Sequence, residues 1–417
     1  MQKTIQARQQ SAAQLFHTLV LVAAGQPIGI PGGQDQTYPF IAHPHYYWLS
    51  GSRRPGGILA FDPDQGWTDF RVPVSAGERI WEGAQNEAGG HDLADLAGWL
   101  QQRAGRPLAV VGAPCDYAGD PDLSQQICRD LLHLRRPKDE SEVHLLERAV
   151  AATASGFARL PQWIGPGVSE REVGVRLESE FFLHGAQRTG YGTIVGTGPD
   201  SAVLHWPPTE RKMAAGDVVL VDAGGCIDDY TADVTRVFAV DGRWDSRQAE
   251  LYQVLLQAQI RAVDGCQVGV EWGDLHVRTA LELSEGLIQL GLLKVSAAEA
   301  VESEVIALFF PHGLGHMLGL GVRDASGLAP GRTEQRKFAG ATLRMDLPLQ
   351  AGYVVTVEPG LYFIPALLND PEKRQQHSHR VAWDRLGPWL QLGGMRIEDN
   401  LYITPEGPRN LTASIPK

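Results

Sequence analysis

Carboxylate side chains occur at the ends of several apolar, strand-like runs in the second half of the chain. Asp222 closes one run ahead of a Gly-Gly turn, Glu358 closes a second ahead of a Pro-Gly turn, and Glu398 lies within a third. A buried carboxylate without a partner is costly, and aspartate is disfavoured in strands. Each of these carboxylates therefore needs a partner. It could form a salt bridge, cap a turn or bind a cation.

Asp233 lies in the strand-like run that follows Asp222. If the two runs pair as a hairpin, the two carboxylates converge, because paired strands lie about 4.8 Å apart. Two converging carboxylates need either a bound cation or a shared proton. The spacing therefore favours a cation site and leaves the structural alternative open.

Two histidines, His312 and His316, are four residues apart in the glycine-rich segment 310–319. The glycines oppose a helix and let the imidazoles approach a ligand. A single histidine is more often structural, but this pair favours a site. Two aspartates, two glutamates and one histidine form an oxygen-rich set that suits manganese, with cobalt, iron or zinc as alternatives. Four carboxylates predict two cations, which share bridging carboxylates at a separation of about 3.5–4 Å.

The elements that must position these residues alternate between strands and helices. We expect strands at 218–223, 231–240, 354–358 and 395–404, and helices at about 170–184, 246–264 and 274–290. A further helical pattern begins after the charged, proline-containing stretch 135–139, so we place a domain boundary near residue 137. This mixture predicts an α+β fold rather than a parallel barrel.

The first part of the chain, residues 1–137, is expected to form a smaller α/β domain. Strands joined by tight turns are predicted within 48–62, another strand at 108–112, and a helix at 92–104. The apolar segment 15–24 resembles a short signal-peptide core. The preferred interpretation is a helix that runs into a first buried strand.

Composition excludes several classes of function. The 417 residues exceed one compact core, so two domains are expected. The net charge of -12 opposes binding to nucleic acid or to an anionic membrane, which carry the same sign. The sequence has no apolar run of the ~18 residues that span a bilayer, and its four cysteines lack a CxxC pair. GxSxG, HExxH, Walker and GxGxxG motifs are also absent. We expect a cytoplasmic enzyme with reduced cysteines.

Five segments occur in a recognisable order: VDAGG, TADVTR, PHGLGHMLG, TVEPGLYF and RIEDN. Together they resemble the family of prolidase, aminopeptidase P and methionine aminopeptidase, over roughly residues 140–410. The motif sequences are most similar to those of the prolidase and aminopeptidase P branch. The resemblance implies a homodimer, with a pita-bread catalytic domain at 138–417 and a creatinase-type N-terminal domain at 1–137.

The resemblance also implies roles for individual residues. The metal ligands would be Asp222, Asp233, His316, Glu358 and Glu398. Among them, Asp233 and Glu398 would contact both ions. His205 matches a family histidine near the substrate, and His312 matches one that stabilises the tetrahedral intermediate.

Two arginines are candidates for substrate binding. Arg344 lies fourteen residues before Glu358, where prolidases carry an arginine that holds the substrate's carboxylate; the alternative is an exposed surface arginine. Arg323 stands where the family usually has a histidine, seven residues after His316. A guanidinium cannot act as a general base, but it can bind a carboxylate or an oxyanion. Pairing of Arg323 with the adjacent Asp324 is the structural alternative.

We expect a Xaa-Pro dipeptidase of the prolidase type, whose substrates are dipeptides ending in proline. A hydroxide that bridges the metals would attack the scissile carbonyl, with Glu358 moving the proton and His312 steadying the oxyanion. Dipeptidase activity is preferred because Arg323 and Arg344 together suit the carboxylate of a short substrate. The alternatives are aminopeptidase P, which acts on longer peptides, and a catalytically inactive pita-bread binding protein. Metal-free hydrolysis of the creatinase kind is disfavoured by the retained ligands.

Overall fold

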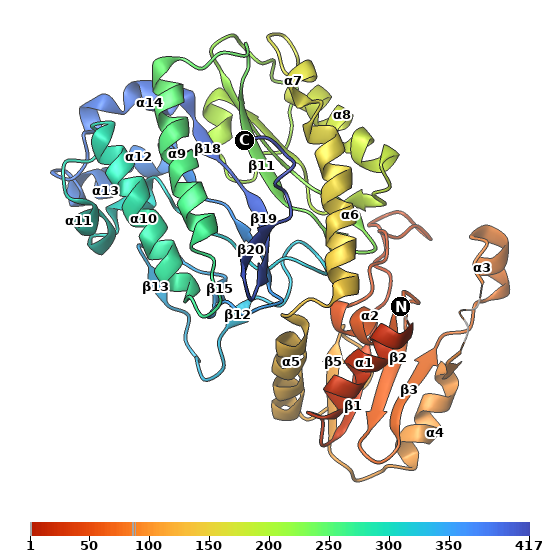
Figure 1. Cartoon of the computed structure of the whole chain (residues 1–417). Coiled ribbons are helices and arrows are strands. Elements are labelled where there is room, and N and C mark those ends of the chain that lie inside the picture. The colour runs from red at the N-terminus through yellow and green to blue at the C-terminus, as the bar shows by residue number, and fades with distance from the viewer. Residues whose placement is uncertain (1, 86, 88) are drawn as a thin grey trace. The chain divides into compact units, whose positions relative to one another are not determined.

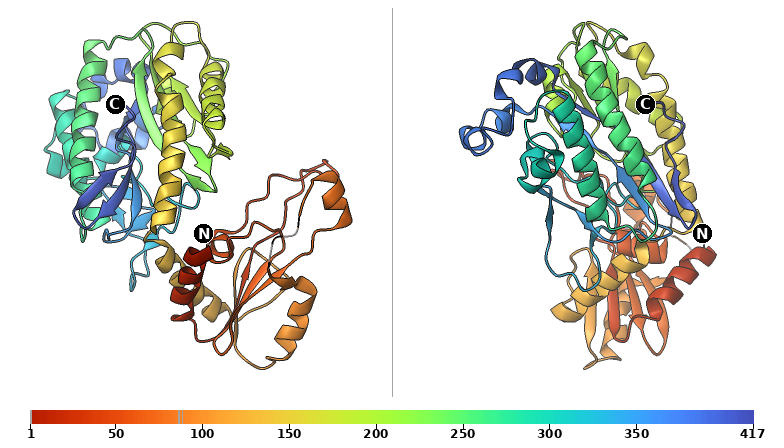
Figure 2. Two further views of the ribbon diagram at one scale, coloured as in Figure 1. Left: turned by 45° about the vertical axis from the view of Figure 1, so that its right-hand side comes forward. Right: turned by 60° about the vertical axis from the view of Figure 1, so that its left-hand side comes forward.

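The computed structural model describes residues 2–85, 87 and 89–417, and the chain divides into two compact units, Met1–Arg135 and Arg136–Lys417. Each unit has its own helices and strands, drawn in Figures 1 and 2. Within the described ranges, no helix is both long and apolar enough to cross a membrane. The mixture of helices with mainly antiparallel sheets confirms the expected α+β class.

The N-terminal unit is built on one mixed sheet with the strand order β4-β3-β2-β1-β5. Its strands are β1 (Leu19–Ala23), β2 (Ile58–Asp62), β3 (Gly66–Arg71), β4 (His91–Asp92) and β5 (Leu108–Gly112). Its helices are α1 (Gln2–Ala13), α2 (Pro44–Ser50), α3 (Ala76–Trp81), η1 (Leu93–Asp95), α4 (Leu96–Gln101) and α5 (Pro121–Arg135). Every residue of β1 is buried, which explains its unbroken apolar sequence.

Two predictions for this unit have different outcomes. The apolar segment 15–24 contributes the buried strand β1 after helix α1, as preferred. The strand expected at the start of 48–62 is wrong, because Trp48 belongs to helix α2. This helix begins at Pro44, whose fixed φ suits a first helical position, and it ends at Gly51 with a φ of 69°. The glycine that suggested a turn between strands is therefore a helix C-cap.

The C-terminal unit combines small sheets with long helices. Its strands are β6 (Arg188–Thr189), β7 (Ile194–Thr197), β8 (Val218–Ala223), β9 (Gly225–Ile227), β10 (Tyr230–Thr231), β11 (Val234–Ala239), β12 (Gly327–Leu328), β13 (Lys337–Phe338), β14 (Ala341–Thr342), β15 (Met345–Asp346), β16 (Val354–Val357), β17 (Gly360–Tyr362), β18 (Gly394–Arg396), β19 (Asp399–Thr404) and β20 (Gly407–Asn410). Its helices are α6 (Glu140–Phe157), α7 (Leu160–Trp163), α8 (Glu170–Leu183), η2 (Gly198–Ala202), α9 (Ser246–Asp264), α10 (Trp272–Gln289), α11 (Ala297–Glu302), η3 (Val305–Leu308), α12 (Pro365–Leu368), α13 (Pro371–Gln376), η4 (Trp383–Arg385) and α14 (Gly387–Leu392).

The long helices of this unit are confirmed within two residues of their expected positions, as α8, α9 and α10. The helix expected after the charged stretch 135–139 is α6. It starts with a capping box, in which Glu142 N donates to the Asp139 carboxylate at 3.0 Å and Asp139 N donates to the Glu142 carboxylate at 3.2 Å. The box satisfies backbone donors that the first turn leaves without partners, and so it defines where the helix begins.

Two sheets of this unit meet at their ends. β8 is the middle strand of the sheet β11-β8-β7 and is buried throughout, with Asp222 opposite Thr235 on β11. The second sheet has the order β16-β19-β20. Isolated bridges join Thr235 to Glu398, and Met317 to Val355 on β16. The acidic strand ends predicted from the sequence are therefore brought to one place.

Two predicted strands are interrupted, each at a candidate ligand. The run expected at 231–240 divides into β10 and β11, and Asp233 lies outside both. The run expected at 395–404 divides into β18 and β19, and Glu398 lies between them. Asp233 N donates to Asn400 Oδ1 at 3.0 Å, and Asn400 Nδ2 donates to the Asp233 carbonyl. A side-chain amide thus replaces the ladder partners that the break removes.

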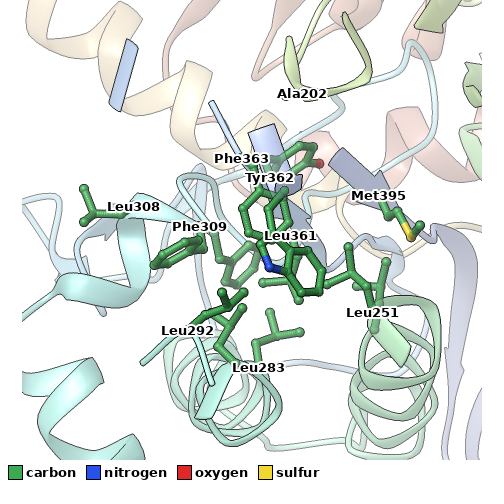
Figure 3. Close-up of a cluster of buried hydrophobic side chains, with 14 of the residues drawn as sticks. Ala202, Leu251, Leu283, Leu292, Leu308, Phe309, Leu361, Tyr362, Phe363 and Met395 are labelled. Carbon is green, nitrogen blue, oxygen red and sulfur yellow. The ribbon is translucent and has the colours of Figure 1, made fainter. Parts of the chain in front are cut away.

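The main hydrophobic cluster fixes the segment that follows Glu358. Helices α9 and α10 lie side by side (Figures 1 and 2) and contribute side chains such as Leu251 and Leu283. Figure 3 shows Tyr362 and Phe363 packed among them. Full burial of a side chain of this size contributes about 2–3 kcal/mol. The cluster therefore anchors β17 directly beside the candidate ligands.

Candidate metal centre

The five candidate ligands converge where the two sheets meet. They come from the end of β8, the two strand breaks, the residue after β16, and the loop before β12: Asp222, Asp233, Glu398, Glu358 and His316. Asp233, His316 and Glu398 each offer a ligand atom within 4.8 Å of the others. His316 Nε2 lies 3.4 Å from Asp233 Oδ2 and 3.7 Å from Glu358 Oε1. Residues far apart in the sequence thus form one cluster.

His316 is held in the tautomer that a metal ligand needs. Its Nδ1 is 3.0 Å from the Met317 carbonyl. A carbonyl only accepts, so Nδ1 carries a proton, and Nε2 is the ring nitrogen that faces the carboxylates and could bind a cation when deprotonated. Burial lowers the pKa of His316, but the hydrogen bond to Asp233 and the charge of Glu358 outweigh burial and raise it. The electrostatic environment around Nε2 therefore favours positive charge, as a cation would supply.

The carboxylates carry an electrostatic cost that a cation removes. Burial raises the pKa values of Asp222, Glu358 and Glu398 above their ordinary range. Repulsion from Asp233 raises all three further, and for Glu398 the pKa is raised well above the usual value. Buried like charges stay ionised together only when positive charge lies between them. An acidic, oxygen-rich donor set with one correctly oriented imidazole fits divalent cations.

Asp222 is fixed by two donors that were not identified from the sequence. Tyr191 donates its hydroxyl to Oδ1 at 2.5 Å, and the Arg396 guanidinium donates to Oδ2. Arg396 is buried and also donates to the Tyr362 hydroxyl at 2.8 Å. The sequence did contain a signal for Arg396. It lies two residues before Glu398, and residues at this spacing in a strand point to the same face.

Glu398 is supported from behind by a hydrogen-bond network. Thr235 Oγ1 donates to its Oε2 at 2.8 Å and accepts from Arg396 Nε at 3.0 Å. Arg236 Nη1 donates to the Glu398 carbonyl at 2.7 Å, and Arg236 Nη2 donates to Asp399 Oδ1 at 2.8 Å. Both partners of this ion pair are buried. Partners of this kind orient a metal ligand and set its charge.

His312 lies beside the ligands and is bonded through both ring nitrogens. Nδ1 donates to the Gly313 carbonyl at 2.8 Å, so Nε2 accepts from the Tyr362 hydroxyl at 2.9 Å. Burial and the nearby Arg396 lower the pKa of His312 to about 3. The imidazole is therefore neutral at physiological pH, and it links the Gly313 backbone to the Tyr362–Arg396 pair.

A cavity of about 440 Å³ opens onto the ligands. His205, Arg323 and Arg344 line it and are exposed, whereas the ligands lie at its base. Part of the wall is apolar, formed by Ile194, Leu204, Pro207 and Val322. Burial lowers the pKa of His205, and Arg323 and Arg344 lower it further. Burial and Arg323 also lower the pKa of Arg344. The two guanidinium groups therefore make one side of the cavity strongly positive.

The backbone around Arg323 is clamped on its C-terminal side. Asp324 is buried, and its carboxylate lies 3.1 Å from the buried Lys138 ammonium. The next carbonyl, that of Ala325, accepts from Arg136 Nε at 3.0 Å. Arg323 thus extends from a fixed loop into the cavity that contains the candidate ligands.

Comparison with known proteins defines the class of the chain. Residues 144–405 match the model of metallopeptidase family M24, and the chain belongs to this family. The prolidase and aminopeptidase P branch, the pita-bread fold and the metallopeptidase class predicted from the motifs are confirmed.

Particular relatives extend over nearly the whole chain. A protein of Aspergillus fumigatus named "Probable Xaa-Pro aminopeptidase" is 30% identical over 413 residues, covering 91% of this chain and 86% of its own length. One of Sordaria macrospora with the same name is 29% identical and covers 95% and 89%. The structure of Escherichia coli aminopeptidase P with the inhibitor Pro-Leu has a TM-score of 0.81 at 25% identity, covering 100% of this chain and 96% of that one.

Proposed function

We propose that the chain is a Xaa-Pro aminopeptidase, which releases the N-terminal residue from peptides with proline in second position. The supporting observation is that all five candidate ligands line one cavity, in a chain whose curated relatives carry that name. The dipeptidase expected from the sequence is therefore replaced by the aminopeptidase alternative as the main proposal. An inactive binding protein is disfavoured because the complete ligand set is oriented and electrostatically suited to cations.

The five ligands Asp222, Asp233, His316, Glu358 and Glu398 would hold two divalent cations, with manganese as the native metal. When bound, the cations polarise the scissile carbonyl and make a water molecule acidic enough to supply the nucleophile. Glu398 and Asp233 lie at strand breaks, where their backbones are held by Thr235 and Asn400. Both residues would therefore present their carboxylates to the cations from a held backbone.

The remaining steps belong to side chains that line the cavity. Glu358 is the candidate proton carrier, since its side chain is 15% exposed beside His316, and it would move a proton to the proline nitrogen as the bond breaks. His205 is neutral above its lowered pKa and can donate one N–H to the substrate carbonyl. His312 presents no N–H to the cavity in this arrangement. We assign it to holding Tyr362 rather than to the oxyanion.

One observation favours dipeptidase activity as a second candidate. Arg323 and Arg344 line the same cavity as the ligands, which is the arrangement that binds the carboxylate of a short substrate. In an aminopeptidase the same charges would attract the C-terminus of a tripeptide or an acidic side chain after proline. The position of the carboxylate along the peptide therefore separates the two candidates.

The decisive experiment compares Xaa-Pro, Xaa-Pro-amide and Xaa-Pro-Xaa peptides on enzyme reconstituted with manganese. The aminopeptidase predicts that the tripeptide is cleaved at least as efficiently as the dipeptide. A preference of more than about tenfold for the dipeptide over both other substrates would support the dipeptidase. Metal-loaded protein that cleaves none of the three would reject both activities.

The homodimer, the cytoplasmic location and the creatinase-type nature of the N-terminal unit stay predictions. Light scattering on the purified chain measures the first, and fractionation of the source cells measures the second. A monomer at micromolar concentration with full activity would reject the proposed dimer.

A further inference from the structure

Glu170, the first residue of α8, directs its carboxylate at the end of β7 and at the loop that follows η2. The side chain is fully buried. Oε1 accepts from Thr197 N at 2.9 Å, and Oε2 accepts from the Trp206 indole N–H at 3.0 Å. Oε2 also accepts from Thr209 through its backbone N at 3.1 Å and its hydroxyl at 2.6 Å. All four donors belong to residues 197–209.

That loop forms one wall of the cavity and has little support of its own. Residues 203–209 lie outside helices and strands, and they include the cavity residues Leu204, His205 and Pro207. Residues 204 and 205 form a turn, and residues 206–208 have no regular secondary structure. Neither a helix nor a strand ladder therefore sets the position of His205, and the hydrogen bonds to Glu170 lie on either side of it.

The helix start does not by itself explain this carboxylate. Ser169 already caps α8, with its hydroxyl accepting from Glu172 N at 3.1 Å. A carboxylate in the first turn is favoured by the helix dipole, which offsets part of the cost of burying Glu170. Three of the four acceptor contacts, however, go to Trp206 and Thr209 of the loop, and the fourth goes to Thr197 at the end of β7.

We propose that Glu170 is a positioning residue that holds His205 in the cavity through Trp206 and Thr209. The proposal rests on the proposed function, because it assigns His205 to the substrate. Hydrogen bonds to a carboxylate are stronger than those between neutral groups, so one ionised side chain can fix a loop that lacks regular structure. A glutamine would keep the shape but present an amide N–H₂ group to at least one of these donors.

The test compares Glu170→Gln with Glu172→Gln, each made in the wild type and in His205→Ala. Glu172 is the matched control, because it lies in the same helical turn, carries the same charge and is 40% exposed beside Arg176. In the wild type, Glu170→Gln should lower kcat/KM on Xaa-Pro-Xaa by about 10-fold, and Glu172→Gln by less than about 2-fold. In the His205→Ala background, both changes should cost less than about 2-fold, because the loop then has no histidine to position.

A second measurement is independent of peptidase activity. Burial, Arg323 and Arg344 lower the pKa of His205. Release of the loop by Glu170→Gln should raise that pKa toward its ordinary value in an NMR titration, and Glu172→Gln should leave it unchanged. Trp206→Phe, which removes one donor and keeps the carboxylate, should act in the same direction if Glu170→Gln fails to fold.

Two results would overturn the proposal. One is an equal loss of kcat/KM from Glu170→Gln in both backgrounds, which shows a purely structural role. The other is an unchanged His205 titration in Glu170→Gln or Trp206→Phe. An inactive wild type whose His205 titration still responds to Glu170→Gln would instead reject the proposed function and retain the positioning role.

Discussion

The base and the rim of the cavity are built by different means. The base consists of the five candidate ligands, which come from sheet ends and are held by further partners such as Arg396 and Thr235. The rim consists of His205, Arg323 and Arg344, which come from loops and are exposed. The base is therefore held by many contacts within the protein, whereas the rim, in the proposed function, selects what enters. Changes at the base should affect all substrates alike, and changes at the rim should depend on the substrate.

The largest expected effect comes from removing a base ligand. Asp233→Ala or Glu398→Ala removes a proposed bridging carboxylate, and activity on every Xaa-Pro substrate should fall by on the order of 10³-fold or more. Bound metal, measured by elemental analysis, should fall as well. Asp241→Ala, at an exposed position, is the control. Wild-type metal content in both ligand variants would show that these carboxylates do not bind the cations.

A smaller loss is expected when the support of a ligand is removed. Arg396→Met deletes the guanidinium that binds Asp222 and Tyr362, and metal affinity or activity should fall by roughly 10- to 100-fold. The loss should be the same for dipeptides and tripeptides. Arg243→Met, at an exposed arginine of the same unit, is the control. A loss confined to one peptide length would show that Arg396 acts on the substrate, as the rim residues are proposed to do. It would contradict the division between base and rim.

The rim should respond selectively. Arg323→Ala should lower kcat/KM by about 10-fold for peptides whose carboxylate reaches the two arginines. The expected loss is at the low end for a charge-assisted hydrogen bond because Arg323 is exposed. The amidated peptide should be much less affected. Arg323→His should recover part of the loss below about pH 6.5, where an ordinary imidazole is charged. Equal kinetics of wild type and Arg323→Ala across pH 6 to 9 would exclude a role in substrate binding.

The smallest effect concerns the pH dependence of stability. Burial raises the pKa values of Asp222, Glu358 and Glu398 in the folded protein. Folding then binds protons, so the free energy of unfolding of metal-free protein should fall as pH rises above about 4, the usual carboxyl range. Manganese should raise the melting temperature by a few degrees more at pH 8 than at pH 5. A metal effect that is independent of pH would contradict this account of the base.

The sequence predicted the strands that carry the candidate ligands better than the residues that support those ligands. Strand β8, with Asp222 next to its last residue, was predicted correctly because an unbroken apolar run with a polar end is a local signal. The breaks at Asp233 and Glu398 were not predicted, since they depend on partners distant in sequence, such as Asn400. Arg396 lies two residues before Glu398, but its role was missed because its partner Asp222 is 174 residues away. Local patterns thus identify which residues reach a site, but not which residues hold them there.

The clamp behind Arg323 has a consequence for altering this protein. Lys138 holds Asp324 and Arg136 holds the Ala325 carbonyl, so the backbone that follows position 323 is held by contacts that do not involve the Arg323 side chain. We expect position 323 to accept different side chains without disturbing the candidate ligands at the bottom of the cavity. A library that randomises residue 323 alone should therefore yield mostly folded, metal-binding variants that differ in the peptides they prefer. This loop is a suitable starting point for redesigning substrate specificity while the candidate metal ligands stay unchanged.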